Sequence, residues 1–367
     1  MKLLRLPPTI CVAALMISLG AWATNARAQA SIELRVEPVG KGQYNVRYHI
    51  LRADTPAGRS APLESAESLA AEAETANPEY PAVLNVPPPG FYEGDVTATT
   101  GAKTLSLNPT VFNAMFVSWT GVVNCLNGTC WGNPNVFMTD LGKSFFIHLS
   151  DQYTHVTTNN RFVLGTPNPN YTFNFTGVND CGIGGTNPCV SDARIRAFVN
   201  FAATNVVHAA GYGHFYHVFL PKNVDECLAP GSCYSPDVPS MFRFCAYHSA
   251  ANVSAGHIIY SVEPFQNIPG CATASPASVN GQLADSTDSV LSHEIFEAIS
   301  DPDINTNHDF KCAPLFGQEI GDICQGPFRT SSGTFVGEIV PTLLLNGHNY
   351  KSQLMYSNNY HACAAGP

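Results

Sequence analysis

Apolar residues recur at helical spacing in two segments of the chain's second half. Residues 191–210, SDARIRAFVNFAATNVVHAA, carry apolar side chains three or four positions apart, and Ser191 or Asp192 is suited to start a helix. A second helix is predicted from about Asp285 to Ile299, within which LSHEIFEAIS combines apolar positions with one histidine and two glutamates. Both patterns predict helices with one face packed on a core.

Other apolar runs are shorter and are bounded by turn residues. A helix is predicted over residues 139–153, TDLGKSFFIHLSDQY, with Thr139 or Asp140 as its cap. Aromatic and β-branched runs predict strands. These runs are RFVLG (161–165), GHFYHVFLP (213–221), MFRFCAYHSA (241–250), HIIYSVEPF (257–265), TFVGEIVPTLLLN (334–346) and YKSQLMYSNN (350–359). The order helix, strand, strand, strand, helix predicts an α/β domain with a mixed β-sheet flanked by helices.

The first 90 residues have a different character. Residues 1–30 have a positive start, an apolar run and small residues near Ala28 and Ala30, so they read as a secretory signal peptide. Residues 31–90 are predicted to form a strand pair followed by a linker rich in Pro, Ala and Glu. The main domain is expected over residues 91–367.

Composition narrows the classes of protein. The chain of 367 residues is 45% hydrophobic and 13% charged, which is enough to build a core and is not typical of disorder. Its formal net charge of −10 argues against a nucleic-acid partner. No further segment is apolar enough for a membrane span. We therefore expect a secreted protein, extracellular or periplasmic, without a membrane span once the signal is removed.

The cysteines fit that compartment. The chain has twelve, and Cys11 lies in the predicted signal, which leaves an odd number. In an exported chain cysteines indicate disulfides rather than a zinc cluster, and no C-x-x-C pair occurs. The predicted pairs are Cys125 with Cys130, Cys181 with Cys189, Cys227 with Cys233, Cys245 with Cys271, and Cys312 with Cys324 or Cys363. One thiol stays free or pairs outside the chain.

Candidate chemistry lies in the stretch LSHEIFEAISDPD, residues 291–303, where His293, Glu294 and Glu297 form an H-E-x-x-E motif on the predicted helix. Residues four apart share one helix face, so His293 and Glu297 are predicted to offer an imidazole and a carboxylate to one metal ion. Glu294 occupies the place of the general base in H-E-x-x-H metalloproteases. Zinc is the expected ion, with manganese or calcium as alternatives because a carboxylate replaces the second histidine.

Further ligands have to come from outside the helix. Glu319 and Asp322, in QEIGDIC, are the preferred source of the third ligand. Asp301 and Asp303 follow the helix and are suited to a turn or to calcium, and His248 ends a predicted strand from which it could reach a pocket. The group His208, His214 and His217 is not expected to be a site, because residues 214 and 217 face opposite sides of a strand.

Four segments together resemble the exordium family, also called the phosphate-induced protein 1 family. They are FCAYHSA (244–250), IIYSVEPFQNIPGCA (258–272), SVLSHEIFEAISDPD (289–303) and EIGDIC (319–324), in the family's order. Upstream, WGNPNVF, FFIHLSDQY and GYGHFYHVFLP are similar to bacterial members. The chain departs from the family over residues 31–90 and lacks its tryptophan after the Asp-Pro turn.

The resemblance implies an extracellular protein, with Cys245 and His248 in an F-C-x-x-H block and His293, Glu294, Glu297, Glu319 and Asp322 as the polar motif. Its H-E-x-x-E helix is similar to that of zinc peptidases, which implies a zincin-like arrangement around this helix. The leading expectation is a metal-dependent, peptidase-like hydrolase that uses a metal-bound water, with an unknown peptide or cell-envelope partner. The alternatives are a non-catalytic extracellular binding protein whose acidic cluster is structural or binds calcium, and carboxylates that only cap helices.

Overall fold

The described part of the chain begins after residue 94. The structure is a computed structural model and describes residues 95–98, 103–105, 131–153, 178–273, 279–304, 319–324 and 340–367, together with the backbone of strands at 111–119, 168–175, 310–311, 328–329 and 335–336. The predicted signal, the segment 31–90, the strand at 161–165 and the cysteines Cys125, Cys130 and Cys312 lie outside the described residues.

The largest sheet in the described part of the chain has five strands, in the order β3-β2-β5-β9-β8. β2 pairs in parallel with β3 and β5, β5 pairs in parallel with β9, and β8 is an antiparallel edge strand. The bounds are β2 Val111–Trp119, β3 Asn168–Phe175, β5 His214–Phe219, β8 Tyr247–Val253 and β9 Gly256–Glu263. The predicted mixed α/β fold is confirmed, including the strands over residues 213–221 and 257–265.

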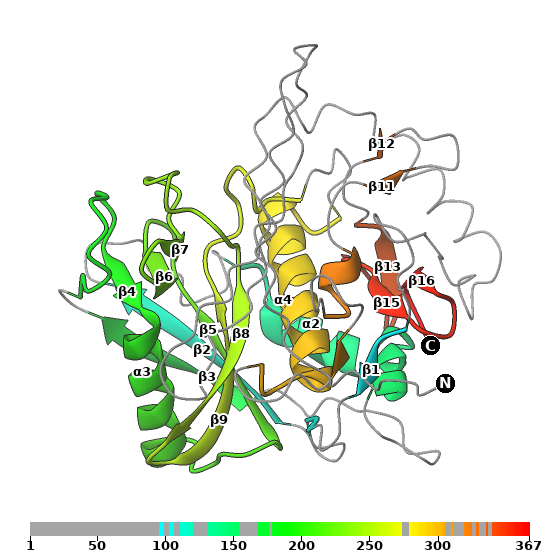
Figure 1. Cartoon of the computed structure of the whole chain (residues 1–367), viewed down its shortest axis with the longest axis horizontal. Coiled ribbons are helices and arrows are strands. Elements are labelled where there is room, and N and C mark those ends of the chain that lie inside the picture. Colours follow the sequence, from blue (N-terminus) through cyan, green and yellow to red (C-terminus); the bar gives the residue numbers. More distant parts are fainter. Residues whose placement is uncertain are drawn as a thin grey trace, which may run out of the picture.

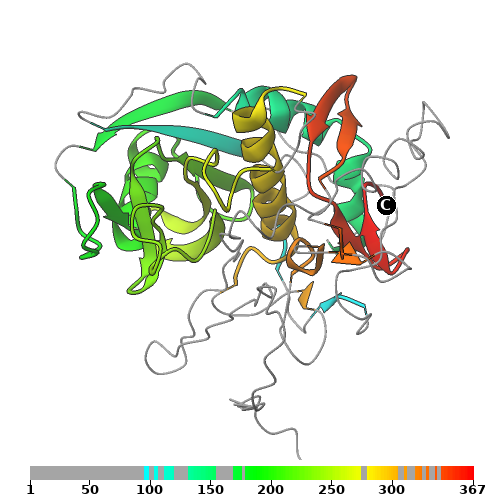
Figure 2. The same cartoon turned by 90° about the horizontal axis from the view of Figure 1, so that it is seen from above.

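Helices cover both faces of this sheet. α3 (Asp192–Asn205) packs on one face and α4 (Gln282–Ser300) on the other, as Figure 1 shows. Figure 2 places α4 between the sheet and the C-terminal strands. Alternate residues of each strand serve the two layers: Tyr216 and Tyr260 join the core beside α3, whereas Phe215 and Ile259 join the core beside α4.

Both long helices were predicted. α3 follows Ser191, and α4 starts three residues before the predicted Asp285. Every residue of α4 from Ala284 to Ser300 is buried, because the sheet covers one side and the C-terminal strands the other. A polar side chain on α4 therefore lies inside the protein and has to find a partner there.

The predicted single helix over residues 139–153 is wrong. The chain forms α2 (Pro134–Gly142) and then a 3-10 helix, η1 (Phe146–Tyr153). The break follows Gly142, a weak helix former, and the Ser144 hydroxyl donates to the Leu141 carbonyl at 2.7 Å. Thr139 is not a cap, since its hydroxyl donates to the Asn135 carbonyl within α2.

Two hairpins follow at the C-terminal end. β13 (Thr342–Leu345) pairs with β14 (His348–Lys351) through Asn346 and Gly347, both with positive φ, which suits a two-residue hairpin turn. β15 (Met355–Ser357) pairs with β16 (Ala362–Ala364). The remaining small sheets join β1 (Thr97–Ala98) with β10 (Phe310–Lys311), β11 (Phe328–Arg329) with β12 (Phe335–Val336), and β4 (Cys189–Ser191) with β6 (Asp225–Ala229) and β7 (Ser232–Tyr234).

Four disulfides lie in the described residues. Three were predicted: Cys181–Cys189, Cys227–Cys233 and Cys245–Cys271. The fourth joins Cys324 to Cys363, so the predicted pairing of Cys312 with either of them is wrong. The cause is tertiary: Cys324 ends the 3-10 helix η2 (Asp322–Cys324), which packs on β15 beside the strand of Cys363. Disulfides of this number are typical of oxidising compartments.

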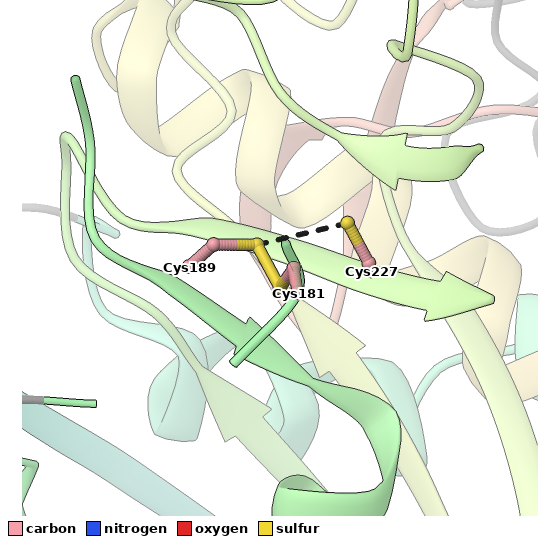
Figure 3. Close-up of side chains that lie close together, drawn as sticks. All are labelled: Cys181, Cys189 and Cys227. Atoms are coloured by element: carbon pink, nitrogen blue, oxygen red, sulfur yellow. Dashed lines mark hydrogen bonds between the residues drawn. A yellow bond between two sulfur atoms is a disulfide. The ribbon is translucent and has the colours of Figure 1, made fainter. Parts of the chain in front are cut away.

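The Cys181–Cys189 and Cys227–Cys233 disulfides are in contact. Figure 3 shows Cys181, Cys189 and Cys227 together, with the Cys189 and Cys227 sulfurs 3.6 Å apart. All three are bonded as disulfides and so offer no thiolate to a metal ion, which agrees with the preference for disulfides over a zinc cluster. Among the described residues, no helix is long and apolar enough to cross a membrane.

Candidate metal centre

The H-E-x-x-E residues lie on a buried face of α4. His293, Glu294 and Glu297 are each at most 1% exposed. The helical spacing brings His293 Nε2 to 3.0 Å from Glu297 Oε1, as predicted for residues four apart. The helix alone therefore supplies one imidazole and one carboxylate at ligand-to-ligand distance.

His248 of β8 faces these glutamates from the sheet. Its Nε2 lies 3.1 Å from the Asp301 backbone carbonyl, which accepts only, so Nε2 carries the proton and donates it. Nδ1 then holds a lone pair, 3.3 Å from Glu294 Oε2 and 3.7 Å from Glu297 Oε2. The sequence predicted that His248 could reach a pocket from the end of a strand. In the structure its ring lies in this centre.

The segment 319–324 closes the centre opposite the sheet. The backbone N–H of Asp322 donates to Glu297 Oε1 at 3.0 Å. Glu319 is 2% exposed, and its Oε1 lies 3.5 Å from His248 Nε2. The Cys324–Cys363 disulfide and a 2.8 Å hydrogen bond from the Tyr356 N–H to the Ile320 carbonyl hold this segment against the C-terminal strands.

Gly321 lies close against the buried face of α4. A Cβ at this position would lie 2.7 Å from His293 Nε2 and 2.8 Å from Glu297 Oε1. Gly321 is not among the residues with positive φ, so the missing side chain matters for room and not for backbone conformation. The absence of a side chain at residue 321 thus lets its backbone approach the two ligand atoms closely.

Gln353 orients His293, although no pattern in the sequence pointed to this residue. Its Nε2 donates to the Gly321 carbonyl at 2.7 Å, which fixes the amide so that Oε1 faces His293 Nδ1 at 2.9 Å. An amide oxygen only accepts, so Nδ1 of His293 is protonated and Nε2 presents its lone pair to the space beside Gly321. Metal-binding histidines are typically held in this way through their other nitrogen.

Burial is the main cause of the shifted pKa values of the histidines and glutamates in this centre. It lowers the pKa of His293 to about 3 and that of His248 to about 4, so both imidazoles are neutral ligands at neutral pH. Burial, followed by the charges of Glu319 and Asp322, raises the pKa of Glu297 well above its usual value. Burial and then the charge of Glu263 do the same to the pKa of Glu294. A cation placed here would favour the ionised form of both carboxylates.

The side chains fit a divalent cation in two groups. One ligand atom each from His293, Glu297 and Asp322 lie within 4.8 Å of one another, and so do ligand atoms from His248, Glu294 and Glu297. A ring nitrogen and two carboxylate oxygens are acceptable ligands for zinc or manganese. Of the two residues predicted as alternatives for the third ligand, Asp322 joins the His293 group, while Glu319 lies beside His248.

Two further candidates take other places. Asp301 contributes its backbone carbonyl as the acceptor for His248. Asp303, suggested for a turn or for calcium, lies outside this centre: its carboxylate contacts His257 Nε2 at 2.7 Å and the Tyr212 hydroxyl. The turn after α4 places Asp303 next to His257, which lies near the start of β9.

His217, Ser261 and Glu263 form a polar row on the same face of the sheet as the centre, and the charge of Glu263 acts on Glu294. His217 Nδ1 lies 2.7 Å from the Ser261 hydroxyl, which donates to Glu263 Oε1 at 2.8 Å. His214, by contrast, is partly exposed at the start of β5, which agrees with the prediction that residues 214 and 217 point apart. Burial raises the pKa of Glu263 to about 8. Strand alternation was the available signal, since residues 261 and 263 share a face.

The fold and site define a mixed α/β protein with a buried centre of histidines and carboxylates between a helix and a sheet. Compared with known proteins, the chain matches no family model, no curated protein and no solved structure. Its function has to be argued from the centre itself.

Proposed function

We propose that the protein is an exported, metal-dependent hydrolase of peptide or amide bonds. His293 Nε2, Glu297 Oε1 and a carboxylate oxygen of Asp322 would hold the cation, zinc or alternatively manganese or calcium. The observation that carries the proposal is the convergence of these ligand atoms within 4.8 Å beside Gly321.

Glu294 is the residue we assign as general base. A divalent cation at this site would lower the pKa of a water molecule that it binds toward neutrality. Glu294 follows His293 on α4 and shares a group of ligand atoms with Glu297, and its Oε1 accepts no hydrogen bond within the described residues. A carboxylate with one oxygen unengaged, and with a pKa raised by burial, can take up a proton and return it to a leaving group.

A zincin-like arrangement and membership of the exordium family belong to the same proposal. The first is proposed from the H-E-x-x-E motif; the structure itself gives a mixed α/β fold in which this helix contacts the antiparallel edge strand β8. The second is supported by the order of the four sequence segments. Export is supported by the N-terminal sequence and by the four disulfides.

A non-catalytic binding protein is the second candidate, and burial favours it. His248, His293, Glu294 and Glu297 are all at most 2% exposed, and Asp322 already bonds the helix to the loop through its backbone. A centre closed to this degree suits a structural or calcium-binding cluster, since hydrolysis needs access for a substrate.

One experiment distinguishes the two candidate functions. Metal content per chain is measured in the wild type and in His293→Ala, and cleavage of a fluorogenic peptide library is measured in the wild type and in Glu294→Gln. A hydrolase loses metal in His293→Ala and loses at least ~100-fold of its cleavage rate in Glu294→Gln. Glu226→Gln is the matched control, because Glu226 is equally buried but contacts Tyr247 elsewhere. Metal without cleavage of any peptide would favour the binding protein.

A further inference from the structure

The two oxygens of Glu297 face different partners. Oε1 lies 3.0 Å from His293 Nε2 and accepts the Asp322 N–H. Oε2 lies 3.7 Å from His248 Nδ1, on the side of Glu294. One carboxylate therefore belongs to both groups of ligand atoms, one oxygen to each.

The His248 side of Glu297 has the spacing of a cation site. Ligands about 2.1 Å from a tetrahedral ion are separated by about 3.4 Å. His248 Nδ1 lies 3.3 Å from Glu294 Oε2 and 3.7 Å from Glu297 Oε2, close to that separation. The Asp301 carbonyl takes the proton of His248 Nε2, so Nδ1 turns a lone pair toward both carboxylates.

Glu294 supplies a second, independent observation. Its side chain is 0% exposed, and its Oε1 has no hydrogen-bond partner within the described residues. Its other oxygen faces a ring nitrogen that carries no hydrogen. A buried carboxylate oxygen without a donor is costly unless a proton or a cation compensates it.

We propose that His248 Nδ1, Glu294 Oε2 and Glu297 Oε2 hold a second divalent cation, and that the Glu297 carboxylate bridges it to the cation beside His293. The inference rests on the proposed metal centre and extends it to a two-cation site. Cations bridged in this way are separated by about 3.5–4 Å in hydrolases that use two ions. Glu294 binds through Oε2 and keeps Oε1 for the proton transfer assigned to it.

Manganese is the probe, because it reports both number and proximity. Chelator-treated full-length protein is loaded with Mn²⁺ and passed through a desalting column, and bound manganese is counted by elemental analysis. The wild type is expected to bind two ions per chain, while His248→Ala and His293→Ala bind one each. His361→Ala is the matched control, because His361 is exposed and pairs with Asp95, and it is expected to bind two.

Electron paramagnetic resonance of the loaded wild type needs no variant, so a variant that fails to fold does not remove the test. Two bridged Mn²⁺ ions give a spin-coupled spectrum, and a lone ion gives the spectrum of isolated Mn²⁺. One ion per chain, retained in His248→Ala and lost in His293→Ala, would overturn the second site and leave the proposed function standing. Two coupled ions without peptide cleavage would support the second site and count against the hydrolase. No bound ion would overturn both.

Discussion

A single backbone carbonyl decides which nitrogen of His293 faces the centre. The Gly321 carbonyl accepts from Gln353, Gln353 accepts from His293 Nδ1, and the opposite nitrogen is left as a ligand. The same logic operates at His248, where the Asp301 carbonyl selects Nδ1. Neutral histidines placed by carbonyls are ready to bind a cation without a change of tautomer.

Replacing Gln353 tests this control. We expect Gln353→Leu to weaken zinc binding by about 10–100-fold, because His293 loses the acceptor that orients it. Gln353→Glu keeps an acceptor for Nδ1 and should recover part of the loss. Zinc affinity is measured by competition with a chelating dye.

The control for Gln353 is Gln266→Leu. Gln266 is also buried, and its Nε2 donates to the Cys245 and Pro264 carbonyls at 2.8 Å, outside the centre. Its zinc affinity should equal that of the wild type. If Gln353→Leu also binds zinc as tightly as the wild type, the orienting role is wrong.

Gly321→Ala tests the space beside His293. The added methyl would lie 2.7 Å from Nε2, so it would have to displace the ligands or the loop, at a cost of about 1–3 kcal/mol. We expect zinc uptake to be lost while the protein stays folded. Gly213→Ala, where nothing lies within 4 Å of the new methyl, should change neither uptake nor melting temperature. Normal zinc uptake in Gly321→Ala would show that the ion sits elsewhere.

The sequence could predict the residues that depend on local spacing. His293 and Glu297 meet because they are one helical turn apart, and the third ligand was expected from either Glu319 or Asp322 in the segment beside Cys324. Gln353 could not be predicted, since it reaches His293 across 60 positions of sequence and stands in an ordinary strand-like segment. Gly321 was equally hidden, because its role is the absence of a Cβ at a contact made only in the folded chain.

At the scale of elements, strand alternation builds half of the centre. β8 and β9 turn His248, Ser261 and Glu263 toward α4, and turn Tyr247 and Tyr260 toward α3. The patterns for α3, α4, β5 and β9 were periodic or strongly apolar and were predicted. The break between α2 and η1 was missed, because one glycine and one serine side chain outweigh the helical pattern over residues 139–153.

An acidic pair at the start of β6 predicts a pH effect. Asp225 accepts from Asn187 and Ser235, and Asp237 accepts the Thr186 and Asn187 backbone N–H groups. Burial, then its contact with Asp237, raises the pKa of Asp225 from 3.8 to about 7. Although burial opposes it, the hydrogen bonds from Asp225 and these backbone groups lower the pKa of Asp237 to about 2.

The raised pKa means that folding favours protonated Asp225. This contribution to stability is complete below the unfolded pKa of about 4 and is lost as pH rises through about 7. The free energy of unfolding should therefore fall by up to about 1.4 kcal/mol per pH unit in this window, and Asp225→Asn should remove that part of the slope. Urea unfolding of both proteins at several pH values measures the difference. Equal slopes would contradict the raised pKa.

At the scale of the whole molecule, the centre joins parts that are distant in sequence. The sheet supplies His248, α4 supplies three residues, and the 319–324 segment supplies Asp322 while resting on the C-terminal strands. The Cys324–Cys363 bridge closes this assembly. Local cysteine pairs were predicted from short loops, but a pair separated by 39 residues depends on tertiary packing and was assigned wrongly.

Removing this bridge should affect both stability and metal binding. The double variant Cys324→Ala with Cys363→Ala is expected to lose about 4 kcal/mol of unfolding free energy by loop-closure entropy, and to bind zinc more weakly because Asp322 is less constrained. The control, Cys181→Ala with Cys189→Ala, should lose about 2.5 kcal/mol with unchanged zinc affinity. Urea unfolding and dye competition measure the two effects. Unchanged zinc affinity in the first variant would contradict the role of Asp322 as a zinc ligand.

Residues 319–324 are supported by the C-terminal strands, which also determines the order in which the parts of the centre become available during synthesis. A chain is synthesised from its N-terminus, so His248 and α4 exist before Gln353 and Cys363 have been made. Until then nothing fixes the tautomer of His293 or the place of Asp322. If the proposed centre binds a cation, its uptake would then be the closing step of maturation instead of the event that starts folding.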